Sequence, residues 1–220
     1  MSSAKIAIIA AAGIGSRLGF NLPKCLVRIG DYPIIKYQLD LLKDFDQVRI
    51  VVGFKAEEVI KVAKDIRKDI IFVHNKHYYE TGNIYSAHLG SQDLKEPFFF
   101  IDGDLIISSK SFSKFVNFSK RNKQTVIGIS TAKTQEAVFV KTDKNLNILG
   151  FSSNPQYDYE WAGVAYFHNL NFHNQNDGFI YKVFEPLLPL KGFNLDLFEI
   201  DTPDDYQFAL GHFKDLLKNC

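Results

Sequence analysis

Short apolar runs of strand length alternate with longer segments over the first 130 residues of the chain. The runs are rich in Ile, Val, Ala and Phe, and they lie at residues 6–12, 48–52, 70–73, 97–101 and 125–129. Bounded apolar runs of this length are typical of buried β-strands. The spacers between them are long enough for helices, so the pattern predicts repeated strand–helix–strand units.

Two of the spacers carry apolar side chains at helical spacing. These are Ile34, Tyr37, Leu41 and Phe45 in the first spacer, and Val59, Val62, Ala63 and Ile66 in the second. The early strands are apolar on both faces, which is typical of parallel strands covered by helices on each side. We therefore expect an α/β fold with a Rossmann-like, doubly wound, mainly parallel mixed sheet.

The alternation of strand-like runs with helix-sized spacers ends at about residue 134. Strand-like runs at residues 137–141, 148–152 and 162–167 follow one another without helix-sized spacers. This spacing predicts a small antiparallel extension of the sheet within residues 134–195. No repeat or linker divides the chain, so residues 1–220 are predicted to form a single domain.

The C-terminal segment carries a readable helix start. A last strand at residues 197–200 is followed by Thr202 as the expected N-cap, Pro203 at the first helical position and Asp205 in the first turn. The apolar face of the predicted helix consists of Tyr206, Leu210, Phe213 and Leu217.

Charge and cysteine content narrow the choice of partners. The formal net charge is +1, from 26 Lys and Arg against 25 Asp and Glu, and the charges are interspersed. We therefore expect neither a nucleic-acid nor a membrane-surface partner. Cys25 and Cys220 are too few for a disulfide framework or a zinc site. Together with the absence of any apolar run near the ~18 residues of a membrane helix, this predicts a cytoplasmic protein.

The first predicted strand leads into a loop suited to phosphate binding. Residues 10–24 read AAAGIGSRLGFNLPK, with Gly13 and Gly15 followed by Arg17 and Lys24. Glycines permit positive φ and let backbone N–H groups approach an anion, while the two cations supply positive charge. A Walker A loop is excluded because Lys24 follows a proline rather than a glycine. A dinucleotide fingerprint fails on its glycine spacing and on the missing acidic residue after the second strand.

The loop resembles the signature of the nucleotidyltransferases that make sugar and alcohol nucleotides, A-A-G-x-G-S-R-L followed by P-K-x-L-V. Within that superfamily the nearest resemblance is to bacterial enzymes of the choline-phosphate cytidylyltransferase type. Further matching stretches occur in the same order along the chain, at residues 74–75, 83–86, 102–104 and 199–203. The resemblance implies the GT-A-like nucleotidyltransferase fold, with residues 134–195 on the acceptor side.

Two aspartates are candidate metal ligands. Asp104 follows a run of four apolar residues, and Asp201 also ends a strand, so both are expected at the carboxyl edge of the sheet where such folds bind ligands. One or two carboxylates completed by phosphates and water suit Mg²⁺. The resemblance assigns the metal to Asp104 and Asp201, with Asp102 assisting through water. The alternative for Asp201 is that it merely caps the following helix.

The resemblance also distributes the nucleotide contacts. It implies that Arg17 and the backbone of the glycine loop hold the β- and γ-phosphates, that Lys24 neutralises charge at the α-phosphate and the acceptor phosphate, and that the base and ribose lie near Gly82 and Asn83. The full set of candidate nucleotide-binding residues is Ala11, Ala12, Gly13, Ile14, Gly15, Ser16, Gly82, Asn83 and Asp102. No histidine base is required, because a phosphate oxygen is already ionised near neutral pH.

The implied reaction transfers CMP from CTP to a small phosphomonoester and releases pyrophosphate, for capsule or cell-surface modification. UTP or another nucleotide stays an alternative, as does a catalytically silent nucleotide-binding domain. The candidate acceptor residues are the aromatic cluster Tyr157, Tyr159 and Trp161 together with Glu160.

The acceptor itself is where this chain departs from the choline-type pattern. A quaternary ammonium is held by aromatic ring faces, and the tryptophan of that pattern is replaced here by Ala137. The aromatic cluster could rebuild such a cage, bind a sugar or amino-acid phosphate such as phosphoglutamine, or cover the core. We predict that phosphocholine is not the best acceptor.

Overall fold

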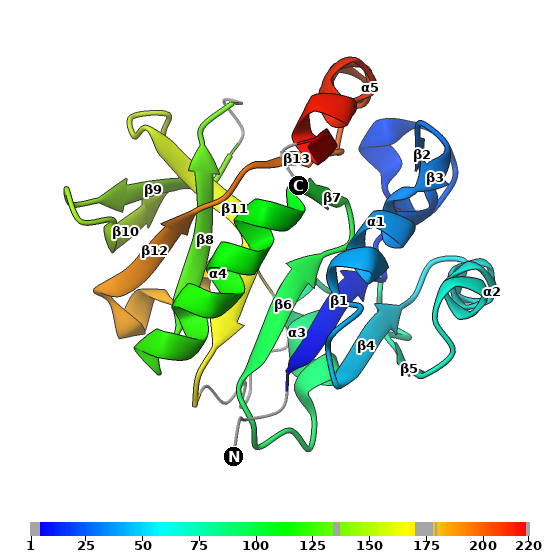
Figure 1. Cartoon of the computed structure of the whole chain (residues 1–220), viewed down its shortest axis with the longest axis horizontal. Coiled ribbons are helices and arrows are strands. Elements are labelled where there is room, and N and C mark those ends of the chain that lie inside the picture. The colour runs from blue at the N-terminus through cyan, green and yellow to red at the C-terminus, as the bar shows by residue number, and fades with distance from the viewer. Residues whose placement is uncertain (1–4, 134–136, 170–177, 179, 219–220) are drawn as a thin grey trace.

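The computed structural model describes residues 5–133, 137–169, 178 and 180–218 of the chain. Nine strands of this part form one sheet, in the order β5-β4-β1-β6-β11-β8-β12-β10-β9 (Figure 1). Their bounds are β1 Ile6–Ala11, β4 Gln47–Val52, β5 Ile70–His74, β6 Phe98–Asp102, β8 Val126–Thr131, β9 Phe139–Thr142, β10 Asn147–Ser152, β11 Tyr159–Phe167 and β12 Leu190–Asn194.

One half of the sheet is parallel and the other is mixed. β1 pairs in parallel with both β4 and β6, and β4 pairs in parallel with β5. β11 runs antiparallel to β6, β8 and β9, and β9 runs antiparallel to β10. The doubly wound sheet with an antiparallel extension is therefore confirmed. The sequence pattern missed β12, which pairs in parallel with β8 inside the extension.

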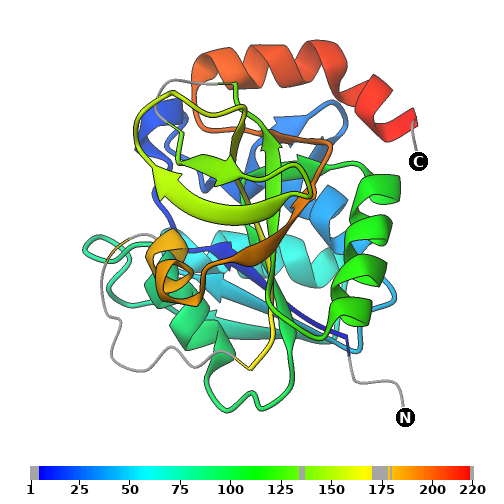
Figure 2. The ribbon, with the colours of Figure 1, turned by 90° about the vertical axis from the view of Figure 1, so that its left-hand side faces the viewer.

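Helices cover both faces of the sheet (Figures 1 and 2). One apolar cluster joins the sheet to α1 (Ile34–Leu41), α2 (Ala56–Ile66) and α4 (Ser109–Asn122). A second cluster, on the other face, joins it to α3 (Asn83–Ser91) and the short helix η3 (Ile180–Val183). The central strands β1, β4 and β6 are apolar because each contributes to both clusters.

The buried face of α1 is wider than the predicted one. The residues that face the core are Ile34, Ile35, Gln38 and Leu39, whereas Tyr37 and Leu41 are half-buried. The helix also ends before Phe45. The predicted residues do pack against the apolar clusters, with Ile34 and Phe45 buried. The pattern missed Ile35, Leu39 and Gln38, because the polar Gln38 interrupts the apolar run although it is fully buried. In α2 the expected face is confirmed, since Val59 and Ala63 are buried and Val62 and Ile66 pack against the core.

Two small antiparallel pairs lie outside the main sheet. β7 (Leu105–Ile107) pairs with β13 (Leu197–Glu199), and β2 (Arg28–Ile29) pairs with β3 (Tyr32–Pro33). The strand predicted at residues 197–200 therefore exists, but it pairs with β7, which follows β6, and not with the main sheet. Because Leu105 is in register with Glu199, this pairing brings the C-terminal segment beside the end of β6.

The C-terminal helix α5 (Pro203–Lys218) begins as predicted. The backbone N–H of Asp205 donates to Thr202 Oγ1 at 3.2 Å, and the N–H of Thr202 donates to Asp205 Oδ2 at 2.8 Å. This reciprocal arrangement is a capping box with aspartate in the usual place of glutamate. Of the predicted apolar face, Phe213 is buried and Tyr206 and Leu210 pack beside it, while the side chain of Leu217 lies outside the described residues.

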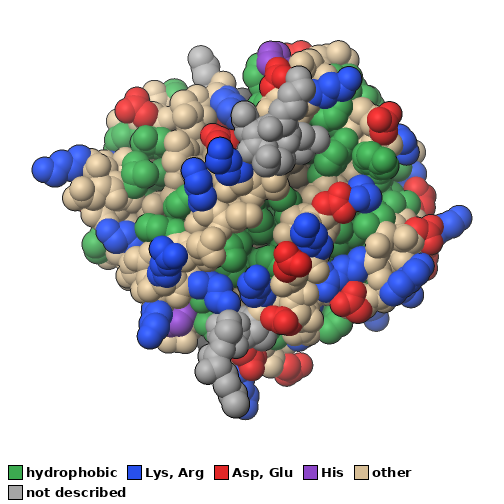
Figure 3. Space-filling model, viewed as in Figure 1, with side chains coloured by type: hydrophobic (Ala, Val, Ile, Leu, Met, Phe, Trp, Pro, Cys, Tyr) green, Lys and Arg blue, Asp and Glu red, His purple; other side chains and the backbone are tan. Residues whose placement is uncertain are grey.

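The charged side chains are unevenly distributed over the face shown in Figure 3. Lys and Arg are more frequent than Asp and Glu over α4 and the strands at the left of Figure 3, and both signs mix elsewhere on that face. None of the described helices is both long and apolar enough to cross a bilayer.

Cys25 is packed in the core, and burial raises the pKa of its thiol to about 12, so it behaves as an apolar residue.

Candidate functional site

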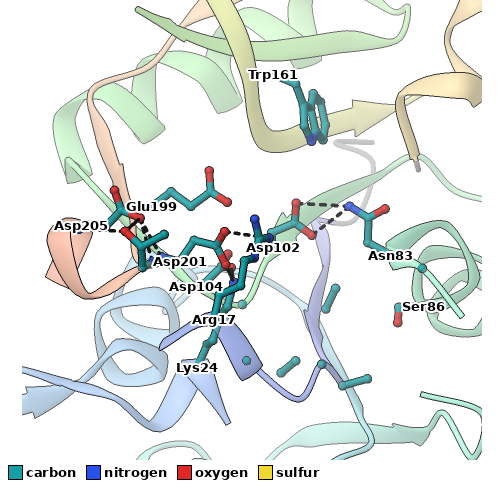
Figure 4. Close-up of a pocket in the computed structure, with 18 of the residues that line it drawn as sticks. Arg17, Lys24, Asn83, Ser86, Asp102, Asp104, Trp161, Glu199, Asp201 and Asp205 are labelled. Atoms are coloured by element: carbon teal, nitrogen blue, oxygen red, sulfur yellow. Dashed lines mark hydrogen bonds and ion pairs between the residues drawn. The ribbon is translucent and has the colours of Figure 1, made fainter. Parts of the chain in front are cut away.

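A cavity of about 630 Å³ opens at the carboxyl ends of the central strands. Its floor is the end of β1 and the glycine loop, and one wall is the turn between β6 and β7. A second wall comes from the start of α3, and a third from β11 and the segment around β13 (Figure 4). Open α/β sheets bind ligands at this edge, so the location agrees with the sequence-based expectation.

In the glycine loop, positive φ occurs at Gly15 and Gly19 but not at Gly13. Gly15 has φ of 66°, and a Cβ there would lie 2.8 Å from the Cγ atom of Lys24. Gly13 has no positive φ, and a Cβ there would meet no atom within 4 Å, so this residue borders open space. The expectation of positive φ at both positions is therefore corrected. Gly13 leaves room at the cavity, whereas Gly15 makes the turn.

The predicted catalytic and metal residues converge into one ion-pair network (Figure 4). Lys24 Nζ lies 2.8 Å from Asp104 Oδ2 and also pairs with Asp201 Oδ1. Arg17 Nη2 lies 2.7 Å from Asp201 Oδ2. Burial lowers the pKa of Lys24, but the two carboxylates outweigh it and hold the pKa above its ordinary value. The ammonium is therefore charged. It joins Asp104 and Asp201, which lie 80 and 177 positions after Lys24 in the chain.

The two carboxylates fit a hard divalent cation. They already share one cation, and Asp104 Oδ1 is buried without a hydrogen-bond partner in the described part of the chain. No group of three or more His, Cys, Asp or Glu side chains able to hold a metal occurs among the described residues. A Mg²⁺ ion held by Asp104 and Asp201 would thus depend on water and ligand oxygens to complete its coordination.

The carboxylate of Asp102, two residues before Asp104, is closely surrounded by other groups. Burial and the nearby charge of Asp104 raise the pKa of Asp102 to about 8. Asn83 Nδ2 points at both of its oxygens from 3.5 Å (Figure 4). A Cβ at Gly163, which has φ of 68°, would lie 2.9 Å from Asp102 Oδ2. The absence of a side chain at Gly163 therefore makes room for Asp102.

The start of α3 is packed tightly against a later segment. Asn83 Oδ1 accepts a hydrogen bond from the Ile180 N–H at 3.1 Å. A Cβ at Gly82 would overlap the backbone oxygen of Gly178. Other polar or aromatic side chains line this part of the cavity although they were not predicted: Asn75, Tyr78, Thr81 and Ser86. Asn75 and Ser86 lie in stretches that match the family pattern, whereas Tyr78 and Thr81 lie between those stretches and had no signal of their own.

The predicted acceptor cluster divides into two groups. Glu160 and Trp161 line the cavity, whereas Tyr157 and Tyr159 are not among the described residues that do so. Trp161 also packs against Phe184, with ring centroids 5.5 Å apart, so it belongs to the core edge and to the cavity wall. Glu160 accepts from Ser130 Oγ at 3.3 Å and from the Lys133 N–H at 3.2 Å. Parts of residues 134–195, namely 134–136, 170–177 and 179, lie outside the described residues.

Sequence reasoning missed most of the wall formed by the segments after β8 and around β13. Lys133 Nζ donates to the Leu197 carbonyl at 2.7 Å and lies 5.3 Å from the Phe198 ring centroid. The unpredicted residues that line this wall are Lys133, Val138, Leu197, Phe198, Glu199, Thr202, Asp205 and Phe208. Of the predicted nucleotide-binding set, Ala11, Ala12, Gly13, Gly15, Gly82, Asn83 and Asp102 line the cavity. Ile14 and Ser16 are not among its described lining residues.

Similar proteins were found by sequence. The model of the MobA-like NTP transferase domain matches residues 7–150. Choline-phosphate cytidylyltransferase of Streptococcus pneumoniae is 32% identical over 111 residues, which cover 48% of this chain and 47% of that protein. The chain thus spans about half the length of that relative. 2-C-methyl-D-erythritol 4-phosphate cytidylyltransferase of Clostridium tetani is 27% identical over 185 residues, covering 73% of this chain and 70% of that protein.

Solved structures resemble the whole chain. The inositol-1-phosphate CTP transferase from T. maritima has a TM-score of 0.76 at 24% identity, with 99% of both chains covered. The CTP:phosphocholine cytidylyltransferase from Streptococcus pneumoniae has a TM-score of 0.78 at 21% identity, covering 96% of this chain and all of that one (100%). At these identities the likeness shows a shared fold.

Two glycines of the cavity wall lead to opposite expectations for stability. Because a Cβ at Gly82 would meet the Gly178 carbonyl, we expect Gly82→Ala to lower the free energy of unfolding by ~1–3 kcal/mol. Gly13→Ala meets no atom within 4 Å and should leave stability unchanged or raise it by ~0.4–1 kcal/mol. Urea unfolding of both variants beside the wild type measures the difference. Equal stability of the two variants would contradict the close approach at Gly82.

Proposed function

This chain belongs to the MobA-like NTP transferase family, and from that premise we propose that it is a Mg²⁺-dependent cytidylyltransferase. The family membership confirms the nucleotidyltransferase resemblance, and the shared fold confirms the expected architecture. The proposal goes further, to CTP as the nucleotide and a small phosphomonoester as the acceptor. It is supported by the cytidylyltransferases among the relatives and structural neighbours.

The observation that carries the proposal is the Arg17–Asp201–Lys24–Asp104 network beside the glycine loop. A nucleotide-binding module needs cations for phosphates, but it does not need two carboxylates at the same point. Carboxylates there would repel the phosphates of a nucleotide unless cations accompany them. Phosphoryl transfer, in contrast, uses both a cation-binding carboxylate pair and fixed positive charge. A catalytically silent nucleotide-binding domain is therefore the weaker interpretation.

The reaction would join two phosphates. An oxygen of the acceptor phosphate attacks the α-phosphorus of CTP, a new P–O bond forms, and the bond to the β-phosphate oxygen breaks so that pyrophosphate leaves with the electron pair. The nucleophile is already ionised, so no protein base has to remove a proton. When bound at Asp104 and Asp201, Mg²⁺ would supply charge neutralisation at the phosphates.

The chain's own residues supply positioning and charge. The loop around Gly13 leaves space for the triphosphate, and Arg17 and Lys24 neutralise its charge. Lys24 lies between the loop and the carboxylates, where charge develops on the α-phosphate and on the leaving group. Catalysis would rest on alignment and electrostatic stabilisation.

The acceptor would lie between Trp161 and the carboxylates, which face each other across the cavity (Figure 4). Ala137 lines the same cavity where the choline-type pattern has a tryptophan, so this wall is less aromatic than a choline site requires. We therefore propose an acceptor other than phosphocholine, of the sugar-phosphate or phosphoglutamine type, for cell-surface or capsule modification.

A screen of nucleotides and acceptors tests the proposal directly. We expect the purified chain with CTP and Mg²⁺ to release pyrophosphate with at least one phosphomonoester, and to stop when EDTA is added. The panel should include sugar 1-phosphates, amino-acid phosphates, phosphocholine and phosphoethanolamine, each also with UTP. Release with no acceptor under any nucleotide would favour the silent domain. Phosphocholine as the best acceptor would contradict the acceptor assignment.

Removal of the bridging ammonium should lower turnover. We expect Lys24→Ala to reduce kcat for pyrophosphate release by ~10²–10³-fold, because a placed charge at the developing phosphate charge is lost. Lys55→Ala is the matched control, since Lys55 donates to the carbonyl of Asn21 in the same loop but is not among the described residues of the cavity. Near-normal kcat in Lys24→Ala would remove its proposed role.

Trp161 should affect the acceptor more than the nucleotide. We expect Trp161→Ala to raise the acceptor KM several-fold, on the order of the ~1–3 kcal/mol of a pocket contact, while the CTP KM changes little. Phe184→Leu is the control, because Phe184 is fully buried behind Trp161 and not among the described lining residues. If both variants lose only thermal stability, Trp161 is a core residue and the assignment is wrong.

A further inference from the structure

Gln38 is a fully buried amide on the apolar face of α1. Its Nε2 donates to two backbone carbonyls, of Asp102 at 2.8 Å and of Leu105 at 3.1 Å. These carbonyls flank Asp104, so one side chain spans the turn that carries two of the cavity's carboxylates, Asp102 and Asp104. Gln38 Oε1 is buried without a hydrogen-bond partner in the described part of the chain. The amide is therefore fixed through its nitrogen alone.

The turn is also anchored from two other directions. The Gly103 N–H donates to the Ala10 carbonyl at 2.9 Å, and a Cβ at Gly103 would lie 2.6 Å from that oxygen. The carbonyl of Asp104 accepts from the Ile200 N–H at 3.0 Å. Strand β1 and Ile200, directly after β13, thus hold the two middle residues of the turn. The side chain of Gln38, on α1, holds the first and last residues of the turn, Asp102 and Leu105.

We propose that Gln38 is a positioning residue that sets the carboxylate of Asp104 relative to that of Asp201. The inference rests on the proposed nucleotidyltransferase reaction, in which these two carboxylates act together. An apolar residue of equal size would fill the same space but leave the carbonyls of Asp102 and Leu105 without this donor. The turn would then shift, and Asp104 with it. A packing role alone would need no amide.

The experiment has to separate a positioning role of Gln38 from a role in packing alone. Gln38→Met keeps the length and burial of the side chain but removes its donor. Gln38→Asn keeps the amide, but it is one methylene too short to reach both carbonyls. The matched control is Leu39→Ala, which removes apolar volume from the same helix at a core residue that is only 3% exposed.

We expect Gln38→Met and Gln38→Asn to lower kcat by ~10–100-fold and to raise the Mg²⁺ concentration for half-maximal activity by about tenfold, while the CTP KM stays within about threefold. Direct Mn²⁺ binding, followed by electron paramagnetic resonance without nucleotide, should weaken by a similar factor. Leu39→Ala should lower the melting temperature at least as much, yet keep kcat and Mn²⁺ affinity near the wild-type values.

Wild-type kcat and Mn²⁺ affinity in either Gln38 variant would overturn the inference, and so would an equal loss in Leu39→Ala. If Gln38→Met does not fold, Gln38→Asn alone decides between these outcomes. If the wild type releases no pyrophosphate with any acceptor, the proposed function fails. The Mn²⁺ comparison then still decides whether Gln38 positions the carboxylates.

Discussion

The structure depends on one ammonium ion placed between two carboxylates. Asp104 lies in the turn between β6 and β7, and Asp201 lies just after β13. Because both carboxylates contact the same ammonium, their like charges lie close together and repel each other. Lys24 offsets that repulsion by pairing with both, and Arg17 adds a second cation at Asp201. The glycine loop, the turn after β6 and the start of α5 are therefore tied together by charge, although they come from the beginning, middle and end of the chain.

Backbone contacts prepare this arrangement. The pairing of β7 with β13 brings residue 199 beside residue 105, and the Asp104 carbonyl accepts from the Ile200 N–H. The capping box at Thr202 and Asp205 then fixes the chain direction immediately after Asp201. Local signals such as the cap are sufficient to predict where α5 starts. The distance between Asp104 and Asp201 is a tertiary property, and no local pattern contains it.

This difference explains what the sequence could and could not predict. The β-strands with long apolar runs, the glycine loop and the strand-end aspartates have local signatures, and the structure places them together. β12 was missed because its residues, LKGFN, form a short and mixed run that becomes a strand only beside β8. Gln38 was missed because its polarity argues for the surface, while its actual partners are 64 and 67 residues away. Lys133 and Phe198 share a wall only after β8 and β13 are packed.

The irregularity in β11 has a consequence for how this fold can vary. The register of β11 with β8 shifts between Trp161 and Ala165, around the positive φ of Gly163. On one side of the shift, β11 pairs with β6 and so with the parallel half of the sheet, and on the other it pairs with β9. The strand thus joins two panels through two extra residues, and the side-chain alternation is kept, since Trp161 and Ala165 both face the second apolar cluster. Substitutions in the outer panel can reshape the wall around Trp161 while the inner panel, which carries Asp102 and leads into the turn with Asp104, keeps its register.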